Sequence, residues 1–176
     1  MESLSICIVS SDFPPNIIGG QGIYAYKLAQ GLCKRGHNVH VIAPVDEFRG
    51  EKWEFKVHPV SRKIKNPLYF SLLAARTMNN IREHFDILHG NGIDHFLICF
   101  KKPKAKVRKI VTTIHNSYLQ RLYYYEVRRK LIYPPLSLLE MFTCRNSDKI
   151  IVVSELSKSF IVKYGIPLKK IIVIHN

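Results

Sequence analysis

The chain has 176 residues, 47% of them hydrophobic, which is enough material to bury one sizeable core. Its 27 Lys and Arg against 13 Asp and Glu give a formal net charge of +14, which favours polyanionic partners such as nucleic acid, anionic lipid headgroups or phosphorylated substrates. Because polar residues interrupt every apolar run and the N-terminus lacks a basic signal-peptide region, we expect a cytoplasmic protein without a transmembrane helix.

Apolar runs of strand length alternate with segments of helical spacing, which predicts one α/β domain over residues 1–176, with a Rossmann-like parallel sheet and helices on both faces. Helices are expected at residues 22–35, 67–84, 93–100 and 155–164, and at 118–146 on either side of a break at Pro134-Pro135. Gly36 is expected to end the first helix. Strands are expected at residues 5–10, 38–43, 55–60, 86–89, 109–114, 150–153 and 170–174.

A glycine pair, Gly19 and Gly20, stands between the first expected strand and the first expected helix. Adjacent glycines at the start of a helix let backbone amides approach an anion closely, and the helix dipole attracts negative charge. The loop is too long for the dinucleotide-binding fingerprint, and Gly-x-Gly-x-x-Gly is absent. The pair is therefore a candidate phosphate-binding loop, and a purely structural turn is the alternative.

Polar residues also follow later strands of the expected sheet. In an open parallel sheet, ligands bind beyond the carboxyl ends of the strands. An imidazole in that place can donate a hydrogen bond to a sugar hydroxyl or phosphate, or accept one, although a lone histidine at a strand end is more often structural. The candidates, in chain order, are His89, Asn91, His115, Asn116, Ser154 and Asn176.

Several other chemistries have no matching motif. The chain contains no Walker loop, no Gly-x-Ser-x-Gly elbow and no pair of histidines with the spacing of a zinc site, so we expect no metal site. The cysteines are far apart and include no Cys-x-x-Cys pair, which predicts free thiols at Cys7, Cys33, Cys99 and Cys144.

These segments, in this order, resemble glycosyltransferase family four, a group of retaining enzymes with two Rossmann-like domains, the GT-B fold. The stretch Phe13-Pro14-Pro15 before Gly19-Gly20 resembles the family opening, and Arg35-Gly36-His37 resembles the end of its first helix. Asn91 replaces a family histidine, and Asn116 replaces an aspartate or glycine. The other matching segments are residues 86–91, 112–116, 147–154 and 171–176.

The resemblance implies that this chain is the N-terminal, acceptor-side half of the enzyme, with the donor-binding domain beyond Asn176. The whole enzyme would transfer a sugar from a nucleoside diphosphate-sugar to an acceptor hydroxyl, without a metal or another cofactor. His115 would lie near the anomeric centre of the donor sugar, and the amides of Gly19 and Gly20 would lie against the donor phosphates or the acceptor. His89 and Ser154 are weaker candidates, for which a structural role is the better interpretation.

The most basic segment has ten Lys or Arg between Lys101 and Lys130 against one acid, Glu126. Its second part, residues 118–133, interleaves tyrosines with arginines, a pattern that suits a helix on an anionic membrane surface and, with it, a lipid-linked acceptor. An ordinary amphipathic helix packed on the sheet is the alternative reading, and a saccharide acceptor stays open. The competing hypothesis for the whole chain is a basic Rossmann-like module that binds nucleic acid without catalysis.

Overall fold

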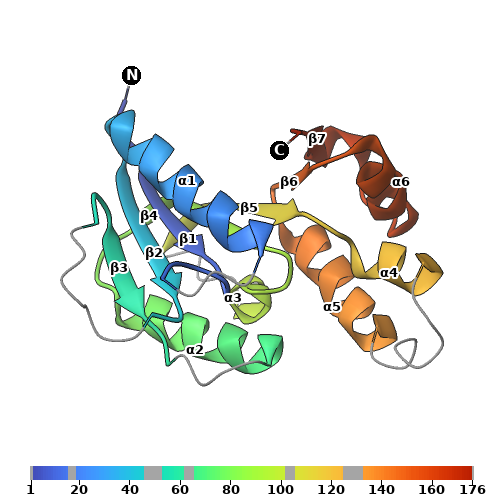
Figure 1. The fold of residues 1–176 in the computed structure, drawn as a ribbon, viewed down its shortest axis with the longest axis horizontal. Helices are drawn as coiled ribbons and strands as arrows, with labels where there is room; N and C mark the ends of the chain where they lie inside the picture. The colour runs from blue at the N-terminus through green and yellow to red at the C-terminus, as the bar shows by residue number, and fades with distance from the viewer. Residues whose placement is uncertain are drawn as a thin grey trace.

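The computed structural model describes residues 2–15, 19–45, 53–61, 66–101, 106–124 and 133–175. Within these ranges a seven-stranded sheet has the order β3-β2-β1-β4-β5-β6-β7, and every paired strand is parallel to its neighbour (Figure 1). This confirms the predicted Rossmann-like class. The strands are β1 (Ser5–Val9), β2 (Asn38–Ala43), β3 (Lys56–Pro59), β4 (Phe85–Asn91), β5 (Val107–Ile114), β6 (Lys149–Val152) and β7 (Ile171–Val173).

Helices follow most of the strands, as the sequence predicts. They are α1 (Gly20–Lys34), α2 (Pro67–Asn80), α3 (Phe96–Lys101), α4 (Tyr118–Tyr124), α5 (Tyr133–Asn146) and α6 (Glu155–Lys163), with a short 3-10 turn, η2 (Leu168–Lys170), before β7. Among the described elements, however, β3 comes directly after β2, and α4 is followed by α5. The strand order reverses direction between β1 and β4, because the chain first builds outward to β3 and then returns to the other side of β1. This reversal is where open α/β sheets bind ligands.

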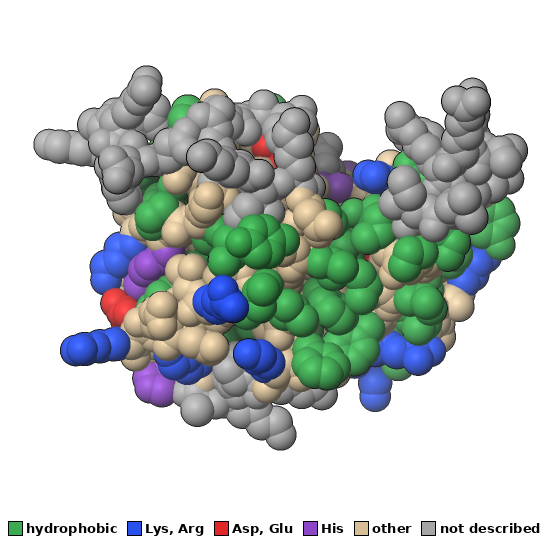
Figure 2. Space-filling model, turned by 90° about the horizontal axis from the view of Figure 1, so that it is seen from below, with side chains coloured by type: hydrophobic (Ala, Val, Ile, Leu, Met, Phe, Trp, Pro, Cys, Tyr) green, Lys and Arg blue, Asp and Glu red, His purple; other side chains and the backbone are tan. Residues whose placement is uncertain are grey.

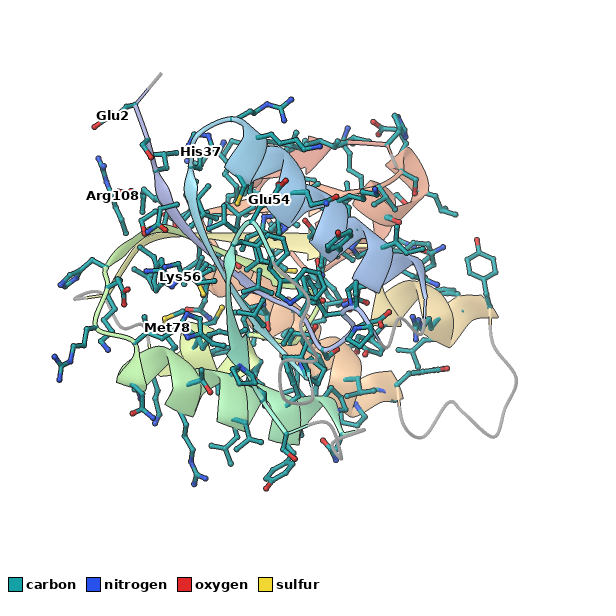
Figure 3. All side chains as sticks on the ribbon, turned by 60° about the vertical axis from the view of Figure 1, so that its left-hand side comes forward. Glu2, His37, Glu54, Lys56, Met78 and Arg108 are labelled. Carbon is teal, nitrogen blue, oxygen red and sulfur yellow. The ribbon has the colours of Figure 1, made fainter. Side chains whose placement is uncertain are left out.

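Strand β1 shows why helices cover both faces. Its alternate side chains Ile6 and Ile8 pack with Ala25 and Ala29 of α1 on one face of the sheet. Cys7 and Val9 point to the opposite face, where they share a core with α2 and α3. Met78 of α2, labelled in Figure 3, belongs to that second core and is 1% exposed. A third core joins β5, β6, α5 and α6.

Local signals at the helix ends agree with the sequence. Gly36 has a φ of 85°, and its N–H donates to the carbonyl of Cys33 while the N–H of His37 donates to that of Leu32, which is the Schellman ending. Asn66 caps α2 by accepting from the N–H groups of Leu68 and Tyr69. The cysteines are free, as predicted.

Several predicted boundaries differ from the structure, and two of these differences concern α2 and α5. Helix α2 ends at Asn80 rather than at residue 84, and Lys106 Nζ donates to the carbonyls of Met78, Asn79 and Ile81 at that end. The pair Pro134-Pro135 does not break a helix but lies in the first turn of α5. Proline is tolerated there because its missing N–H has no partner within the helix.

Strand β4 continues past the predicted His89 to Asn91, and this longer strand requires a glycine. Gly90 pairs with Thr112 of β5, and the ring of His95 lies directly over its Cα. A Cβ at position 90 would stand only 1.9 Å from His95 Nδ1. The His95 ring is held there by a hydrogen bond of 2.8 Å between its Nε2 and Thr112 Oγ1.

Gly90→Ala should therefore lower the free energy of unfolding by about 3 kcal/mol, because the fully buried His95 ring has nowhere to move. Gly31→Ala is the control, since the nearest atom to its added Cβ is 3.5 Å away on Arg35 and alanine favours the helix by about 0.5–1 kcal/mol. Urea unfolding of both variants measures the difference. Equal stability of Gly90→Ala and the parent would contradict the described contact.

Candidate active site

A cavity of about 260 Å³ opens at the carboxyl ends of β1, β4 and β5, at the point where the strand order reverses. Helices α1, α2, α4 and α5 contribute the rest of its wall. The lining residues are Ser11, Gln21, Pro67, Asn91, Gly92, Ile93, Asp94, Ile114, His115, Asn116, Tyr118, Arg121 and Glu140. Three of the predicted site residues, Asn91, His115 and Asn116, thus meet in one cavity.

His115 follows the last residue of β5 and is half-buried. Its ring stands edge-on to the ring of Tyr24 from α1, with centroids 4.7 Å apart. Burial lowers the pKa of His115, so the ring is neutral at neutral pH. Its Nε2 is buried and has no hydrogen-bond partner among the described residues, which leaves that atom to a ligand.

His89 lies behind this ring rather than in the cavity wall. Its Nε2 hydrogen-bonds with Thr113 Oγ1 at 2.9 Å, and Thr113 Oγ1 in turn hydrogen-bonds with the hydroxyl of Tyr24 at 3.2 Å. Burial, and secondarily His115, lowers the pKa of His89 to about 4. His89 therefore stays neutral and fixes the tyrosine against which His115 packs, which is the structural role preferred from the sequence.

The side-chain amide of Asn91 is held in place by Ser10, which directly follows β1. Its Nδ2 donates to Ser10 Oγ at 3.1 Å, while its Oδ1 has no partner among the described residues although the side chain is 1% exposed. Asn116 is exposed at the mouth of the same cavity. An unpartnered buried carbonyl oxygen is costly, so Asn91 Oδ1 is well suited to accept a hydrogen bond from a ligand hydroxyl.

Two buried carboxyl groups in the wall escaped the sequence prediction. Asp94 is 4% exposed, and its Oδ2 accepts from the N–H of Ser11 at 2.7 Å and from Gln21 Nε2 at 3.4 Å. Burial raises the pKa of Asp94 to about 7, although the hydrogen bonds from Ser11 oppose this shift. Because Gln21 is the second residue of α1, Asp94 ties the start of that helix to the turn after β4.

Glu140 of α5 is the second such group and is 1% exposed. Its Oε2 accepts from Ser117 Oγ at 2.7 Å, from the N–H of Tyr118 at 3.0 Å and from the hydroxyl of Tyr164 at 2.8 Å. Burial raises the pKa of Glu140 to about 7 against these hydrogen bonds. Glu140 thereby joins the start of α4 and the end of α6 to α5.

Arg121 supplies the cationic group of the cavity. Its guanidinium lies over the ring of Tyr118, 5.2 Å from the centroid. Its Nε is buried and has no hydrogen-bond partner among the described residues. Arg121 was noted in the sequence only as part of a basic segment, because nothing in the pattern indicated that its side chain turns inward.

The glycine pair lies beside the cavity rather than in its wall. Gly19 precedes α1, and its N–H donates to Asp12 Oδ2 at 2.9 Å; the N–H of Gly22 donates to the same oxygen at 3.1 Å. The protein's own carboxylate thus already occupies the start of α1, so a donor phosphate there would have to share or displace it.

The remaining candidates are separate from this site. Ser154 caps α6, since its Oγ accepts from the N–H of Ser157 at 3.1 Å, which accounts for it structurally. Asn176 lies outside the described residues. Across the part of the chain that the structure describes, no group of three or more His, Cys, Asp or Glu is placed to hold a metal ion, and no helix is long and apolar enough to cross a membrane.

Chemically, the cavity offers both donors and acceptors from side chains that are mostly buried. Three polar atoms there lack a partner among the described residues: Asn91 Oδ1, His115 Nε2 and Arg121 Nε. Hydrogen-bonding groups of both kinds suit a ligand rich in hydroxyl groups. The volume corresponds to about nine water molecules at roughly 30 Å³ each, which is room for a compact polar group.

Comparisons with known proteins identify the family of this chain. The model of Glycosyltransferase Family 4 matches residues 18–176. An uncharacterised glycosyltransferase of Methanocaldococcus jannaschii is 26% identical over 186 aligned residues, which cover 98% of this chain and 46% of that protein. The chain thus spans about half the length of this curated relative.

Solved structures show the same fold at low sequence identity. Sucrose-phosphate synthase from Thermosynechococcus elongatus has a TM-score of 0.75 at 13% identity, covering 98% of this chain and 48% of that one. The catalytic domain of starch synthase IV from Arabidopsis thaliana, bound to ADP and acarbose, has a TM-score of 0.68 at 16% identity, covering 99% of this chain and 52% of that one. HepE from Anabaena, in complex with UDP-glucose, has a TM-score of 0.61 at 15% identity, covering 98% and 44%. The chain therefore belongs to glycosyltransferase family 4, and its fold is the Rossmann-like N-terminal half of a GT-B enzyme.

Proposed function

We propose that this protein forms the acceptor side of a retaining hexosyltransferase, which moves a sugar from a nucleoside diphosphate-sugar to an acceptor hydroxyl. The observation that supports this most directly is the convergence of Asn91 Oδ1, His115 Nε2 and Arg121 Nε, all without partners among the described residues, in one cavity beyond the strand ends. Family membership favours this function over a module that binds nucleic acid without catalysis.

The donor would be held mainly by a second domain. Two structural neighbours are described with a nucleotide or nucleotide-sugar bound, ADP in the starch synthase and UDP-glucose in HepE, and this chain spans about half of each. By analogy we place the diphosphate on a C-terminal domain outside these 176 residues, with the amides of Gly19 and Gly20 facing it when the cleft closes, where it would share or displace Asp12 as the partner of the Gly19 N–H. No metal or other cofactor is needed, because donors of the two domains would neutralise the leaving diphosphate.

His115 would act on the transferring sugar through its free Nε2. A neutral imidazole can donate to a sugar hydroxyl or accept from it without adding a charge to the cleft. The edge-on contact with Tyr24, which is fixed in turn through Thr113 and His89, holds the ring in one orientation. Such preorganised contacts are the main way in which an enzyme stabilises charge that develops during group transfer.

The acceptor would lie in the cavity itself. Asn91 Oδ1 can accept from an acceptor hydroxyl, and Asp94 and Glu140 set the charge of the wall. Either a saccharide or the headgroup of a lipid-linked acceptor would fit this chemistry. For a lipid-linked acceptor, the protein would work in the cytoplasm at the inner surface of an anionic membrane. Tyr123 and Tyr124 of α4, 65% and 67% exposed, belong to the segment that suggested such contact, while residues 125–132 of it lie outside the described residues.

Replacement of His115 tests the site. In the full-length protein, His115→Ala should lower kcat/KM by about 100-fold or more, since one preorganised polar contact to the transferring sugar is lost. Release of nucleoside diphosphate from a panel of nucleotide-sugars is the readout. The matched control is His84→Ala, which removes an exposed histidine between α2 and β4 and should leave activity unchanged. Full activity of a folded His115→Ala protein would overturn the assignment.

The isolated chain tests the two-domain proposal. Residues 1–176 alone should show no transfer with any nucleotide-sugar, because the wall that binds the diphosphate is missing. The same assay with the full-length protein provides the positive control. Turnover by the 176-residue chain at a rate comparable to that of the full-length protein would show that the donor site lies within this domain.

The pH dependence of stability tests the buried Asp94. Burial raises the pKa of Asp94 from 3.8 to about 7, so the folded protein holds a proton that the unfolded chain releases. The stability gained from this neutral carboxyl is complete below about pH 4 and is lost as the pH rises to about 7. Asp94→Asn removes this titration. The variant should therefore become more stable relative to the parent as the pH rises from about 4 to about 7, and the difference between their free energies of unfolding should change by up to about 4 kcal/mol.

Asp148→Asn is the control for this experiment. Partial burial acts to raise the pKa of Asp148, but hydrogen bonds from the N–H of Ile110 and from Lys109 Nζ outweigh it and lower the pKa. Its contribution to stability is therefore lost only in acid below that range. Urea unfolding at about pH 5 and about pH 8 separates the two variants. An equal stability difference at both pH values for Asp94→Asn would show that Asp94 is ionised when the cavity is empty.

A further inference from the structure

An apolar patch lies on the outer face of α3 and α5. We define it as Phe96, Phe100, Leu138 and Phe142, in which Phe142 of α5 contacts both α3 rings, with centroids 5.3 Å from Phe96 and 5.7 Å from Phe100. Leu138 is one helical turn before Phe142 and so shares its face. Phe100 is 64% exposed and Leu138 is 60% exposed, so the part of the chain that the structure describes leaves the patch uncovered.

The patch belongs to a wider surface on the side of the sheet that α2 covers. Helix α2 packs against α3, and its first turn exposes Leu68 and Tyr69 by 41% and 51%. Figure 2 views the molecule from this side and shows apolar side chains gathered across its centre. Apolar patches of this kind on a folded domain mark a surface that binds another molecule or a membrane.

The exposed charged residues of the helices that form this surface are cationic. Helices α2, α3, α4 and α5 contain a single acid among their described residues, Glu140, which is buried in the cavity wall. Arg76 and Lys101 of the same helices are exposed. In Figure 2 lysine and arginine side chains border the apolar area, and very few acidic side chains are visible on this face. An apolar centre with a cationic border matches the layered chemistry of an anionic bilayer surface.

We propose that the α2–α3–α5 face docks on an anionic lipid bilayer, with Phe100 and Leu138 among the upper acyl chains and with Arg76 and Lys101 at the lipid phosphates. Only the purpose of docking, which is to bring a membrane-held acceptor to the site, rests on the proposed function. Pro67 of α2 and Glu140 of α5 also line the cavity, so a membrane-held acceptor would reach the site over these helices. The proposal places the contact on α3 and α5 rather than only on the tyrosine-rich segment that begins at α4.

Co-sedimentation of the full-length protein with vesicles tests this face. Vesicles of phosphatidylcholine with phosphatidylglycerol should bind the protein, pure phosphatidylcholine vesicles should bind it much less, and added salt should weaken binding. The double variant Phe100→Glu, Leu138→Glu should bind the anionic vesicles about tenfold more weakly or worse, because it replaces inserted apolar groups by charges that the lipids repel.

The matched control is the double variant Leu168→Glu, Ile172→Glu, which changes the same number of exposed apolar residues at η2 and β7. These positions are 62% and 43% exposed, and β7 lies apart from α3 and α5 in Figure 1. This control should bind vesicles like the parent. Equal loss in both double variants would show that only net charge matters and would overturn the proposal. So would a dimer in light scattering that dissociates on Phe100→Glu, Leu138→Glu, since it would assign the patch to a second copy.

Vesicle binding needs no donor sugar, so its outcome is separate from that of the proposed function. His115→Ala should bind vesicles like the parent while losing transfer activity. Vesicle binding without transfer by any nucleotide-sugar would leave the docking face intact and remove the proposed reaction. Transfer to a water-soluble acceptor without vesicle binding would support the proposed reaction and overturn the docking face.

Discussion

Parallel pairing of β4 with β1 on one side and β5 on the other determines where the polar groups of the site lie. The register aligns Val9 with Gly90 and aligns Gly90 and Asn91 with Thr112 and Thr113. Hydrogen bonds between side chains then cross both strand pairs, from Asn91 to Ser10 and from His89 to Thr113. A slip of one residue would turn these side chains to the opposite face of the sheet, so the cavity depends on this register.

Most of the buried polar side-chain atoms that lack a hydrogen-bond partner among the described residues lie in the cavity. Buried polar atoms without partners cost stability, and carboxyl groups such as Asp94 and Glu140 resist ionisation because they are buried. Outside the cavity, His40 Nε2 and His95 Nδ1 are also buried without partners among the described residues, while apolar side chains make up most of the core on both faces of the sheet. Three of the five such atoms among the described residues line this one cavity, which favours a binding site over a packing defect.

Much of the fold could be predicted because its signals are local. The apolar run at residues 5–10 indicated a strand buried on both faces, and Gly36 marked the end of α1 through its own backbone conformation. The ordered strand ends brought His115, Asn91 and Asn116 to one edge, because parallel strands end on the same side. These predictions needed only residue spacing and the topology of alternating strands and helices.

Other features depend on contacts between distant segments. Asp94 was expected in the helix at residues 93–100 but lies in the turn before α3, and only the approach of Ser11 and Gln21 makes it part of the site. Glu140 is the only acidic residue of α5, and a single acid in a largely apolar helix was a signal of a buried polar site. Its burial, however, depends on hydrogen bonds from Ser117 and Tyr164. The hydrogen bond from the Gly19 N–H to Asp12 likewise depends on where the Asp12 carboxylate lies and not on the glycine pair itself.

We propose that sugar transfer takes place at the mouth of the cavity bounded by β1, β4 and β5. The most direct measurement is a crystal structure of the full-length protein with an intact, non-transferable nucleoside diphosphate-sugar. We predict that the anomeric carbon lies over the cavity and that His115 Nε2 is within hydrogen-bonding distance of the sugar. A donor sugar bound elsewhere, with His115 and Asn91 still without a ligand contact, would contradict this account.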